Sequence, residues 1–193
     1  MRFVGHRDVM RCFERWFRRA VLPLSFSEGF HPKPRMMFPA PLAVGIEGLD
    51  EVMELELSAS QSAEAIHSRL LQHSPPGFRV RSVEALPPGT PKARPRAFRY
   101  RVHVPPECRA GLAEDVRRLL ASPSALVERP GGRAAVDVRP LLDDLKFEDG
   151  VLSMCLAVPP SGGAAPRDLL AALGRADLLQ EGARVQRTTV EVH

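Results

Sequence analysis

A proline-rich segment near the middle of the chain limits what the chain can fold into. Residues 87–97 read PPGTPKARPRA, with four prolines, three basic residues and no acidic residue. Proline fixes its own backbone angle and donates no hydrogen bond, so such a run fits neither a helix interior nor a central strand. We therefore expect a stiff, extended linker at 87–97, with one domain at 1–86 and another at 98–193.

The net charge of the chain lies in its first half. The 193 residues carry 27 Lys and Arg against 23 Asp and Glu, a formal charge of +4. Residues 1–96 hold 14 basic and 10 acidic side chains, whereas residues 97–193 hold 13 of each. With 44% hydrophobic residues the composition is that of a globular protein, which excludes wholesale disorder.

The sequence predicts a cytoplasmic protein with no membrane association and no metal or cofactor of its own. No apolar run approaches the roughly 18 residues of a membrane span, and the first 19 residues hold six arginines without the apolar stretch of a secretory signal. Cys12, Cys108 and Cys155 lie too far apart for a disulfide framework or an iron–sulfur motif.

Hydrophobic periodicity predicts an α+β fold. Helical spacing occurs at residues 7–21, 62–73, 107–121 and 166–173. Strand-like segments occur at 24–27, 52–57, 78–83, 98–104, 126–129, 134–138, 151–158 and 185–192. Each half then follows the β-α-β-β-α-β order, which predicts two tandem ferredoxin-like halves with antiparallel sheets. The first strand of the N-terminal half is expected to be truncated.

The first helix has a basic face. Its apolar residues recur every three or four positions and form one stripe, namely Val9, Phe13, Trp16, Phe17 and Ala20. Arg11, Arg15 and Arg18 fall largely outside this stripe. We expect these arginines to face solvent and to be available to an anionic ligand.

The segment SFSEGFHPKPRMMFPAP, residues 25–41, is the densest candidate site. Two prolines stiffen it around Lys33, and it holds His31 and Arg35 as well. Phe26, Phe30 and Phe38 accompany these cations. Cations beside aromatic rings suit phosphate contacts and base stacking, as at single-stranded nucleic-acid sites. The alternative is a hairpin whose phenylalanines belong to the core and whose basic residues are simply solvated.

Two histidines are weak candidates for acid–base catalysis. His6 precedes the first helix and His31 lies in the basic segment, and an imidazole changes charge near neutral pH. The alternative for His6 is a structural contact at the helix terminus. Residues 143–149 contain an acidic run that we interpret as a solvated loop and not as a metal site. No phosphate-binding loop, dinucleotide fingerprint or nucleophile elbow is present.

Several blocks of the sequence resemble the DUF2344 family of radical SAM-linked proteins. The family's pattern runs roughly RF-x-SH-x-D-x-M-R, then SxGFxPxP, then PLxxGxE. The positions that carry the resemblance are Arg2-Phe3, His6, Asp8, Met10-Arg11, Phe13-Glu14, Arg18-Arg19, residues 26–34 and residues 41–47. Residues 136–139 and Arg187-Thr188 resemble the family's later landmarks. Gly5 replaces the usual serine before His6, and the chain begins where relatives have already made most of their first strand.

The resemblance implies a partnership with a radical SAM protein. The iron–sulfur cluster and S-adenosylmethionine are then expected on that partner, because this chain has no three-cysteine motif.

The first hypothesis is therefore an accessory protein of a radical SAM enzyme that binds RNA or presents a substrate. Its contacts would come from Arg11, Arg15, Arg18, Phe30, His31, Lys33 and Arg35, with Arg94, Arg96 and Arg99 adding a diffuse basic strip. The alternatives are a stand-alone RNA-processing enzyme or transferase that uses His6 and His31, and a purely structural partner. An independent enzymatic activity is left open.

Overall fold

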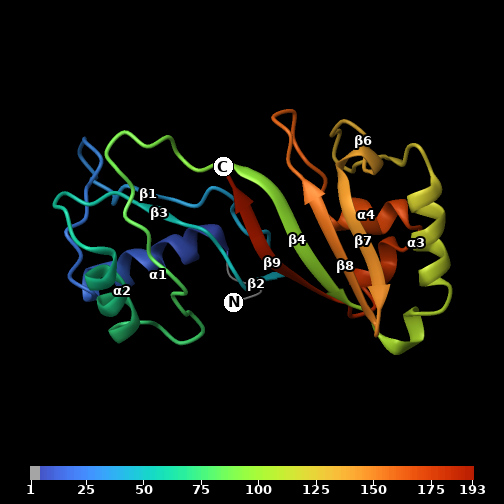
Figure 1. The fold of residues 1–193 in the computed structure, drawn as a ribbon, viewed down its shortest axis with the longest axis horizontal. Coiled ribbons are helices and arrows are strands. Elements are labelled where there is room, and N and C mark those ends of the chain that lie inside the picture. The colour runs from blue at the N-terminus through green and yellow to red at the C-terminus, as the bar shows by residue number, and fades with distance from the viewer. Residues whose placement is uncertain (1–4) are drawn as a thin grey trace. The chain divides into compact units, whose positions relative to one another are not determined.

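The structure, a computed structural model, describes residues 5–193 and divides into two compact units. The N-terminal unit contains the described residues up to Val44 together with Val52–Ala93, and the C-terminal unit contains Gly45–Glu51 and Arg94–His193. Both helices and sheets are present, so the predicted α+β class is confirmed at that level. Figure 1 shows the elements, which are α1 (His6–Arg19), β1 (Met36–Met37), β2 (Ile46–Gly48), β3 (Glu54–Leu55), α2 (Ala63–Gln72), β4 (Pro95–His103), α3 (Leu112–Ala121), β5 (Leu126–Val127), β6 (Val136–Asp137), β7 (Leu142–Glu148), β8 (Val151–Ala157), α4 (Pro166–Ala172) and β9 (Arg184–Val192), with short 3₁₀ turns at Pro106–Cys108, Arg139–Leu141 and Ala176–Leu179.

The core of the N-terminal unit forms around the apolar stripe of α1. Trp16, Phe17 and Ala20 are buried, and they pack with Ile66 and Leu70 of α2. The Trp16 indole N–H donates to the Leu70 carbonyl at 3.1 Å, which satisfies its buried donor. The predicted stripe is therefore the face that folds inward.

The four-stranded antiparallel sheet expected in the first half is not formed by the described residues 5–93. Two two-residue strands, β1 and β3, pair antiparallel there. Isolated bridges join Leu24 to Leu57 and Phe26 to Pro34. Residues 78–83, predicted as a strand, form no ladder. Phe78, Val80 and Val83 nevertheless pack against the core, because side-chain alternation reports which side faces inward and not whether the backbone finds a partner.

The C-terminal unit is built on a five-stranded sheet of order β2-β9-β4-β8-β7. β2 pairs parallel with β9, and the other neighbours are antiparallel. Along the chain, β4, α3, β7, β8, α4 and β9 follow one another, with the β5–β6 hairpin inserted after α3. Side chains of α3 and α4 share one buried core with Tyr100, Val102 and Leu152, so both helices cover the same face of the sheet (Figure 1).

Strand β7 corrects the prediction that residues 143–149 form a solvated loop. Leu142 and Leu145 of this strand are buried, whereas Asp143, Asp144 and Glu148 are exposed. Asp149 and Gly150 both have positive φ, of 50° and 77°. This is the two-residue turn that joins β7 to β8, and the Asp-Gly pair is a typical hairpin signal. The acidic run is therefore the polar face of an edge strand.

The start of α3 also differs from the prediction. The helix expected at 107–121 begins only at Leu112, because Gly111 adopts a left-handed φ of 75°. Residues Pro106–Cys108 form a 3₁₀ turn before it. The linker expected at 87–97 likewise ends earlier, since β4 begins at Pro95.

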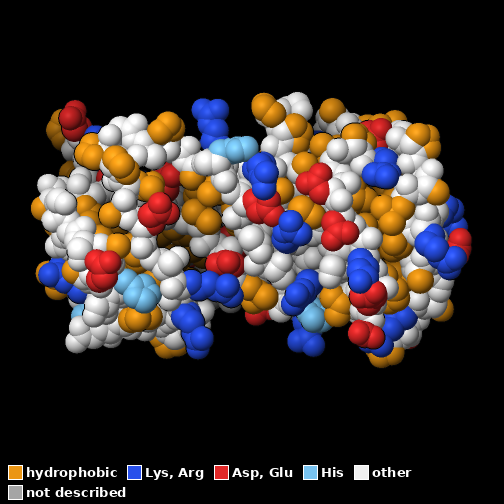
Figure 2. Space-filling model, in the orientation of Figure 1, with side chains coloured by type: hydrophobic (Ala, Val, Ile, Leu, Met, Phe, Trp, Pro, Cys, Tyr) orange, Lys and Arg blue, Asp and Glu red, His pale blue; other side chains and the backbone are white. Residues whose placement is uncertain are grey.

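The face of the sheet opposite α3 and α4 is polar and carries both charges. On β4 the residues of this face include Arg99, Arg101 and His103, which alternate with the buried Tyr100 and Val102. Figure 2, in the orientation of Figure 1, shows acidic and basic side chains intermingled over these strands. Charge on this face is therefore balanced locally.

None of the described helices is both long enough and apolar enough to cross a membrane.

The end of α1 contains a strained residue. The Val21 N–H donates to the Arg18 carbonyl and the Leu22 N–H to the Phe17 carbonyl, at 3.1 and 3.2 Å, which is the Schellman pattern of a helix terminus. Val21 then occupies the left-handed position, with φ of 51°, where glycine is favoured. Its side chain is 74% exposed, so packing does not compensate for this strain.

We expect Val21→Gly to stabilise the protein by about 1 kcal/mol, because relief of left-handed strain exceeds the entropy that glycine adds to the unfolded chain. Urea unfolding measures the change. Val21→Ala serves as a control, since it keeps a Cβ and should gain less. A less stable Val21→Gly variant would contradict the assignment of strain.

Candidate nucleic-acid interface

Residues 25–35 form a closed hairpin, which we call the basic hairpin. The Ser27 N–H donates to the Lys33 carbonyl at 2.8 Å, and the Arg35 N–H donates to the Ser25 carbonyl at 2.8 Å. The Lys33 N–H donates to the Ser27 hydroxyl at 3.0 Å. These bonds fix the two arms of the hairpin and define residues 28–32 as its tip.

The base of the basic hairpin is attached to the strand segment that follows β3. The Ser25 N–H donates to the Glu56 carbonyl, and the Glu56 N–H donates to the Arg35 carbonyl, both at 2.9 Å. The hairpin is therefore anchored through its backbone on both arms.

The tip projects an aromatic ring into solvent. Gly29 has a φ of 115°, a conformation that few other residues adopt without strain. Phe30 follows it with 101% relative exposure, and His31 and Lys33 are exposed as well. The turn thus presents a ring and two basic side chains together.

The three phenylalanines of the predicted site have different environments. Phe38 packs edge-on against Phe13, with ring centres 5.1 Å apart. Phe26 lies under the Arg18 guanidinium, whose central carbon is 5.8 Å from the ring centre. Phe30 makes no such contact with the described residues. Phe38 is therefore partly buried against Phe13, whereas Phe30 is the fully exposed ring of the three.

Arg35 has a structural role in the basic hairpin. Its Nε donates to the Phe26 carbonyl at 3.2 Å, and its Nη1 lies 3.5 Å from a carboxylate oxygen of Glu56. The guanidinium thereby bridges both arms and the anchoring segment. Its charge is already partly matched by Glu56.

The exposed face of α1 carries a strip of arginines. Arg7, Arg11, Arg15 and Arg18 are spaced by four, four and three residues, so they lie on one side of the helix, and all are exposed. Arg11 lies 3.9 Å from Asp8. Arg18 lies 2.8 Å from Glu14. Arg15 forms no ion pair with any described residue. We call these four residues the arginine strip.

The arginine strip and the basic hairpin meet within the N-terminal unit. Arg18, the last residue of the strip, lies over the ring of Phe26 at the base of the hairpin. Arg11, Arg15, Arg18, Phe30, His31 and Lys33 are all exposed.

The two predicted histidines are not brought together by anything that the structure describes. His6 begins α1, but its side chain lies outside the described residues. His31 is exposed at the hairpin tip and has no hydrogen-bond partner among residues 5–193. The acid–base hypothesis therefore stays a prediction.

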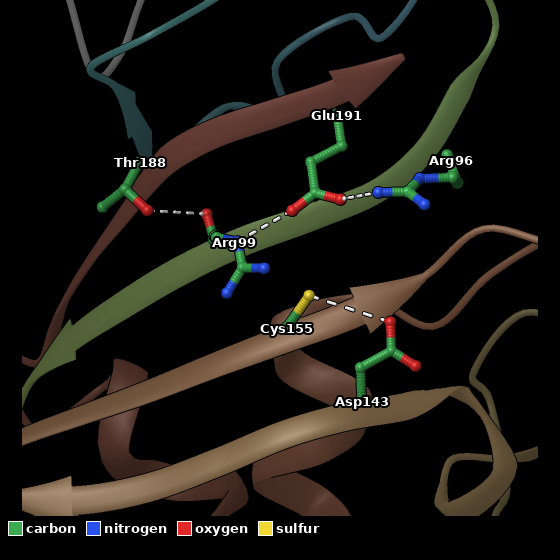
Figure 3. A network of polar contacts seen from close by, with 6 residues as sticks. All are labelled: Arg96, Arg99, Asp143, Cys155, Thr188 and Glu191. Atoms are coloured by element: carbon green, nitrogen blue, oxygen red, sulfur yellow. Dashed lines mark hydrogen bonds and ion pairs between the residues drawn. The ribbon is translucent and has the colours of Figure 1, made fainter. Parts of the chain in front are cut away.

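A network around Glu191 accounts for two of the arginines that were expected to add a diffuse basic strip. Its carboxylate accepts from Arg96 at 2.6 Å and from Arg99 at 2.8 Å (Figure 3). The hydrogen bonds from Arg96 and then Arg99 lower the pKa of Glu191. Both cations are thus shared with one carboxylate, which leaves them less available to phosphate than Arg15.

Cys108 and Cys155 each have a carboxylate beside the thiol. Cys155 is buried beside the Glu191 network, 3.8 Å from Asp143, and its burial raises the pKa of its thiol. The Cys108 thiol donates to Glu181 at 3.0 Å, which raises its pKa to about 11. Both thiols are protonated at neutral pH, whereas the thiolate is the nucleophile and metal ligand. No group of three or more His, Cys, Asp and Glu side chains among the described residues is arranged to hold a metal ion.

A family model described as "Uncharacterized protein conserved in bacteria (DUF2344)" matches residues 1–166. The chain belongs to the DUF2344 family. Comparison with curated proteins gives no significant match, and neither does comparison with solved structures. The matched residues of this DUF2344 chain include the whole basic hairpin and the arginine strip.

Sequence reasoning missed that two segments with family resemblance, residues 41–47 and Arg187-Thr188, lie side by side in this DUF2344 chain. The segment Gly45–Glu51 adds β2 to the edge of β9, where Ile46 lies opposite Val185, 139 residues later in the chain. Glu51 accepts from Arg187 Nε at 2.9 Å, and Glu47 accepts from the Gln186 amide at 2.7 Å. Arg187 is only 3% exposed. No local pattern predicts this pairing, because β2 is three residues long.

Residues 136–139, which also resemble the family, contain an aspartate that accepts three hydrogen bonds. The Asp137 carboxylate accepts from the Ala125 N–H at 2.7 Å, the Ser124 hydroxyl at 2.7 Å and the Arg139 N–H at 3.1 Å. These bonds, led by that from Ala125, lower the pKa of Asp137. The aspartate therefore organises the β5–β6 hairpin.

The Glu191 network predicts a pH dependence of stability. A carboxyl with a lowered pKa in the folded state contributes stability above its ordinary pKa of 4.5, and loses it as the pH falls through the folded value. We expect Glu191→Gln to be less stable than the parent protein at pH 7, and the difference to shrink below about pH 4.5.

Urea midpoints at pH 7, 5, 4 and 3 measure that difference. Glu128→Gln is the matched control, because Glu128 is exposed and forms no ion pair with the described residues. A difference that is the same at pH 3 as at pH 7 would show that the charge of Glu191 contributes nothing.

Proposed function

We propose that this protein is an RNA-binding accessory of a radical SAM enzyme and that it holds RNA on the arginine strip and the basic hairpin. The observation that carries the proposal is the contact of Arg18 with Phe26, which joins the two cationic elements into one surface. That surface ends at a fully exposed phenylalanine. Cations beside exposed aromatic rings are the usual composition of a site for single-stranded nucleic acid.

The electrostatics of the surface support an anionic ligand. Arg7, Arg15 and Lys33 are exposed and form no ion pair with the described residues. Each is free to contact a phosphate and to release a counterion, which is the main source of sequence-independent affinity for nucleic acid. In contrast, Arg96 and Arg99 are both bonded to Glu191.

The radical SAM partnership rests on the family resemblance. We propose that the partner supplies the iron–sulfur cluster and S-adenosylmethionine and that the complex works in the cytoplasm. The wide spacing of Cys12, Cys108 and Cys155 along the sequence, which gives no three-cysteine motif, supports this division of labour. Cluster ligation requires thiolates.

We further propose that the C-terminal unit is ferredoxin-like. Support comes from the chain order of β4, α3, β7, β8, α4 and β9 and from the sheet order β9-β4-β8-β7. Ferredoxin-like folds serve many functions, so the RNA proposal does not depend on this one.

The RNA proposal predicts a specific salt dependence. We expect the protein to bind a fluorescein-labelled mixed-sequence 12-nucleotide RNA and bulk tRNA, with affinity falling steeply as salt rises. Arg15→Gln combined with Lys33→Gln should reduce the slope of log K against log salt by about 1.4, since each phosphate contact on a single strand contributes about 0.7. Fluorescence anisotropy between 25 and 200 mM salt measures this slope.

The matched control is Arg96→Gln combined with Arg99→Gln, which removes the same charge from side chains already bonded to Glu191. We expect the slope for this control to equal that of the parent protein. Equal effects of the two pairs would show that only net charge matters. No binding of either RNA at the lowest salt would eliminate the proposal.

The partnership is tested by affinity capture of the full chain from its own cells. We expect a radical SAM protein to be recovered after nuclease treatment, and Arg15→Glu combined with Lys33→Glu to retain that protein while losing RNA. Retention of both partner and cellular function by this variant would favour a purely structural role. Recovery of no radical SAM protein would contradict the partnership.

A further inference from the structure

The tip of the basic hairpin presents one fully exposed ring. Phe30 is 101% exposed and makes no ring contact with the described residues. A single exposed apolar side chain is ordinary on a protein surface, so the turn that carries Phe30 and the residues beside it carry the argument. Phe26 and Phe38, by comparison, are engaged with Arg18 and Phe13.

The backbone around Phe30 is held in place before any ligand arrives. The bonds between Ser27 and Lys33 close the turn. Pro32 and Pro34 restrict the second arm, and Pro34 is buried. A side chain on a pre-organised turn loses little conformational freedom on binding.

The surroundings of Phe30 are polar. His31 and Lys33 are exposed on one side, and Glu28 is exposed on the other. An anchor for an apolar protein pocket is normally surrounded by further contacts that exclude water. A ring that shares its turn with a lysine instead matches a nucleotide, which combines a flat base with a phosphate.

On the basis of the proposed RNA binding, we propose that Phe30 stacks on an unpaired nucleobase while Lys33 and the arginine strip hold the adjoining phosphates. The ligand class is then single-stranded or looped RNA. A regular duplex already stacks both faces of each base, so its bases are not accessible to Phe30. Stacking on a phenyl ring tolerates all four bases, so we expect little dependence on sequence.

Three substitutions at position 30 separate stacking from apolar contact. Phe30→Leu keeps an apolar side chain without a π face, Phe30→Ala removes the side chain, and Phe30→Trp enlarges the π face. We expect Phe30→Leu and Phe30→Ala each to weaken binding of the 12-nucleotide RNA by about 5- to 150-fold, as loss of one stacked base does. Phe30→Trp should bind at least as tightly, with its fluorescence quenched by the RNA.

The RNA is varied in the same experiment. We expect the parent protein to bind the single strand more tightly than the same sequence as a duplex, and Phe30→Ala to lose this preference. Removing the base from one nucleotide at a time should weaken binding to the parent protein at one or more positions and leave Phe30→Ala unaffected. Leu126→Ala is the matched control, because Leu126 is 68% exposed in the C-terminal unit, and it should bind RNA like the parent protein.

The failures of the two proposals are distinguishable. Absence of salt-dependent RNA binding overturns the proposed function and the stacking with it. Salt-dependent binding that is equal for single strand and duplex, or unchanged in Phe30→Leu, overturns the stacking alone. Loss of a protein partner in Phe30→Ala with unchanged RNA affinity assigns the ring to a protein pocket and also overturns the stacking.

Discussion

The packing of Phe13 and its neighbours determines which side of α1 faces solvent. The Phe13 ring lies 5.4 Å from Trp16, 5.1 Å from Phe38 and 5.0 Å from Phe78, measured between ring centres. Contacts of this kind add to the free energy gained by burying the rings. Since one side of the helix is fixed inward, Arg7, Arg11, Arg15 and Arg18 are left on the other. The same rings bring Phe38, which follows the basic hairpin, and Phe78, which follows α2, to one place. The positions of the exposed cations and of the hairpin that carries Phe30 therefore depend on the packing of this core, although the cations themselves are not part of it.

The sequence predicts the helices well because their signal is local and repeated. All four predicted helices are present, and α2 lies within one residue of its expected bounds. The strands of the N-terminal unit are predicted less well, since Phe78, Val80 and Val83 pack against the core but residues 78–83 form no ladder. Strand β2 has no local sequence pattern that predicts it, because it is held by β9, which lies far away in the chain. Strand β7 had an available signal in Asp149-Gly150, whose positive φ values make the hairpin turn.

Residue types alone identify the candidate interface, but not which of its side chains are available. The hairpin sequence predicts a stiff basic loop, and the backbone bonds of Ser27 and Lys33 confirm a hairpin. Distances are needed to see that Arg35 bridges Phe26 and Glu56, and that Arg96 and Arg99 share Glu191. A charge is equally visible in the sequence whether it is neutralised or free. This is why the count of basic residues overstates the surface that remains for a ligand.

The two units carry different kinds of polar surface. The C-terminal sheet has a polar face on which acidic and basic side chains are intermingled (Figure 2). In the N-terminal unit, Arg7, Arg15 and Lys33 are exposed and form no ion pair with the described residues, and the Phe30 ring is exposed as well. The central claim is that RNA lies on the N-terminal unit. Photocrosslinking of the full-length protein to a 4-thiouridine-labelled RNA, followed by mass spectrometry of the peptides, locates the contact directly. We expect crosslinks within residues 25–35 and α1. Crosslinks confined to β4, β7 and β8 of the C-terminal unit would contradict it.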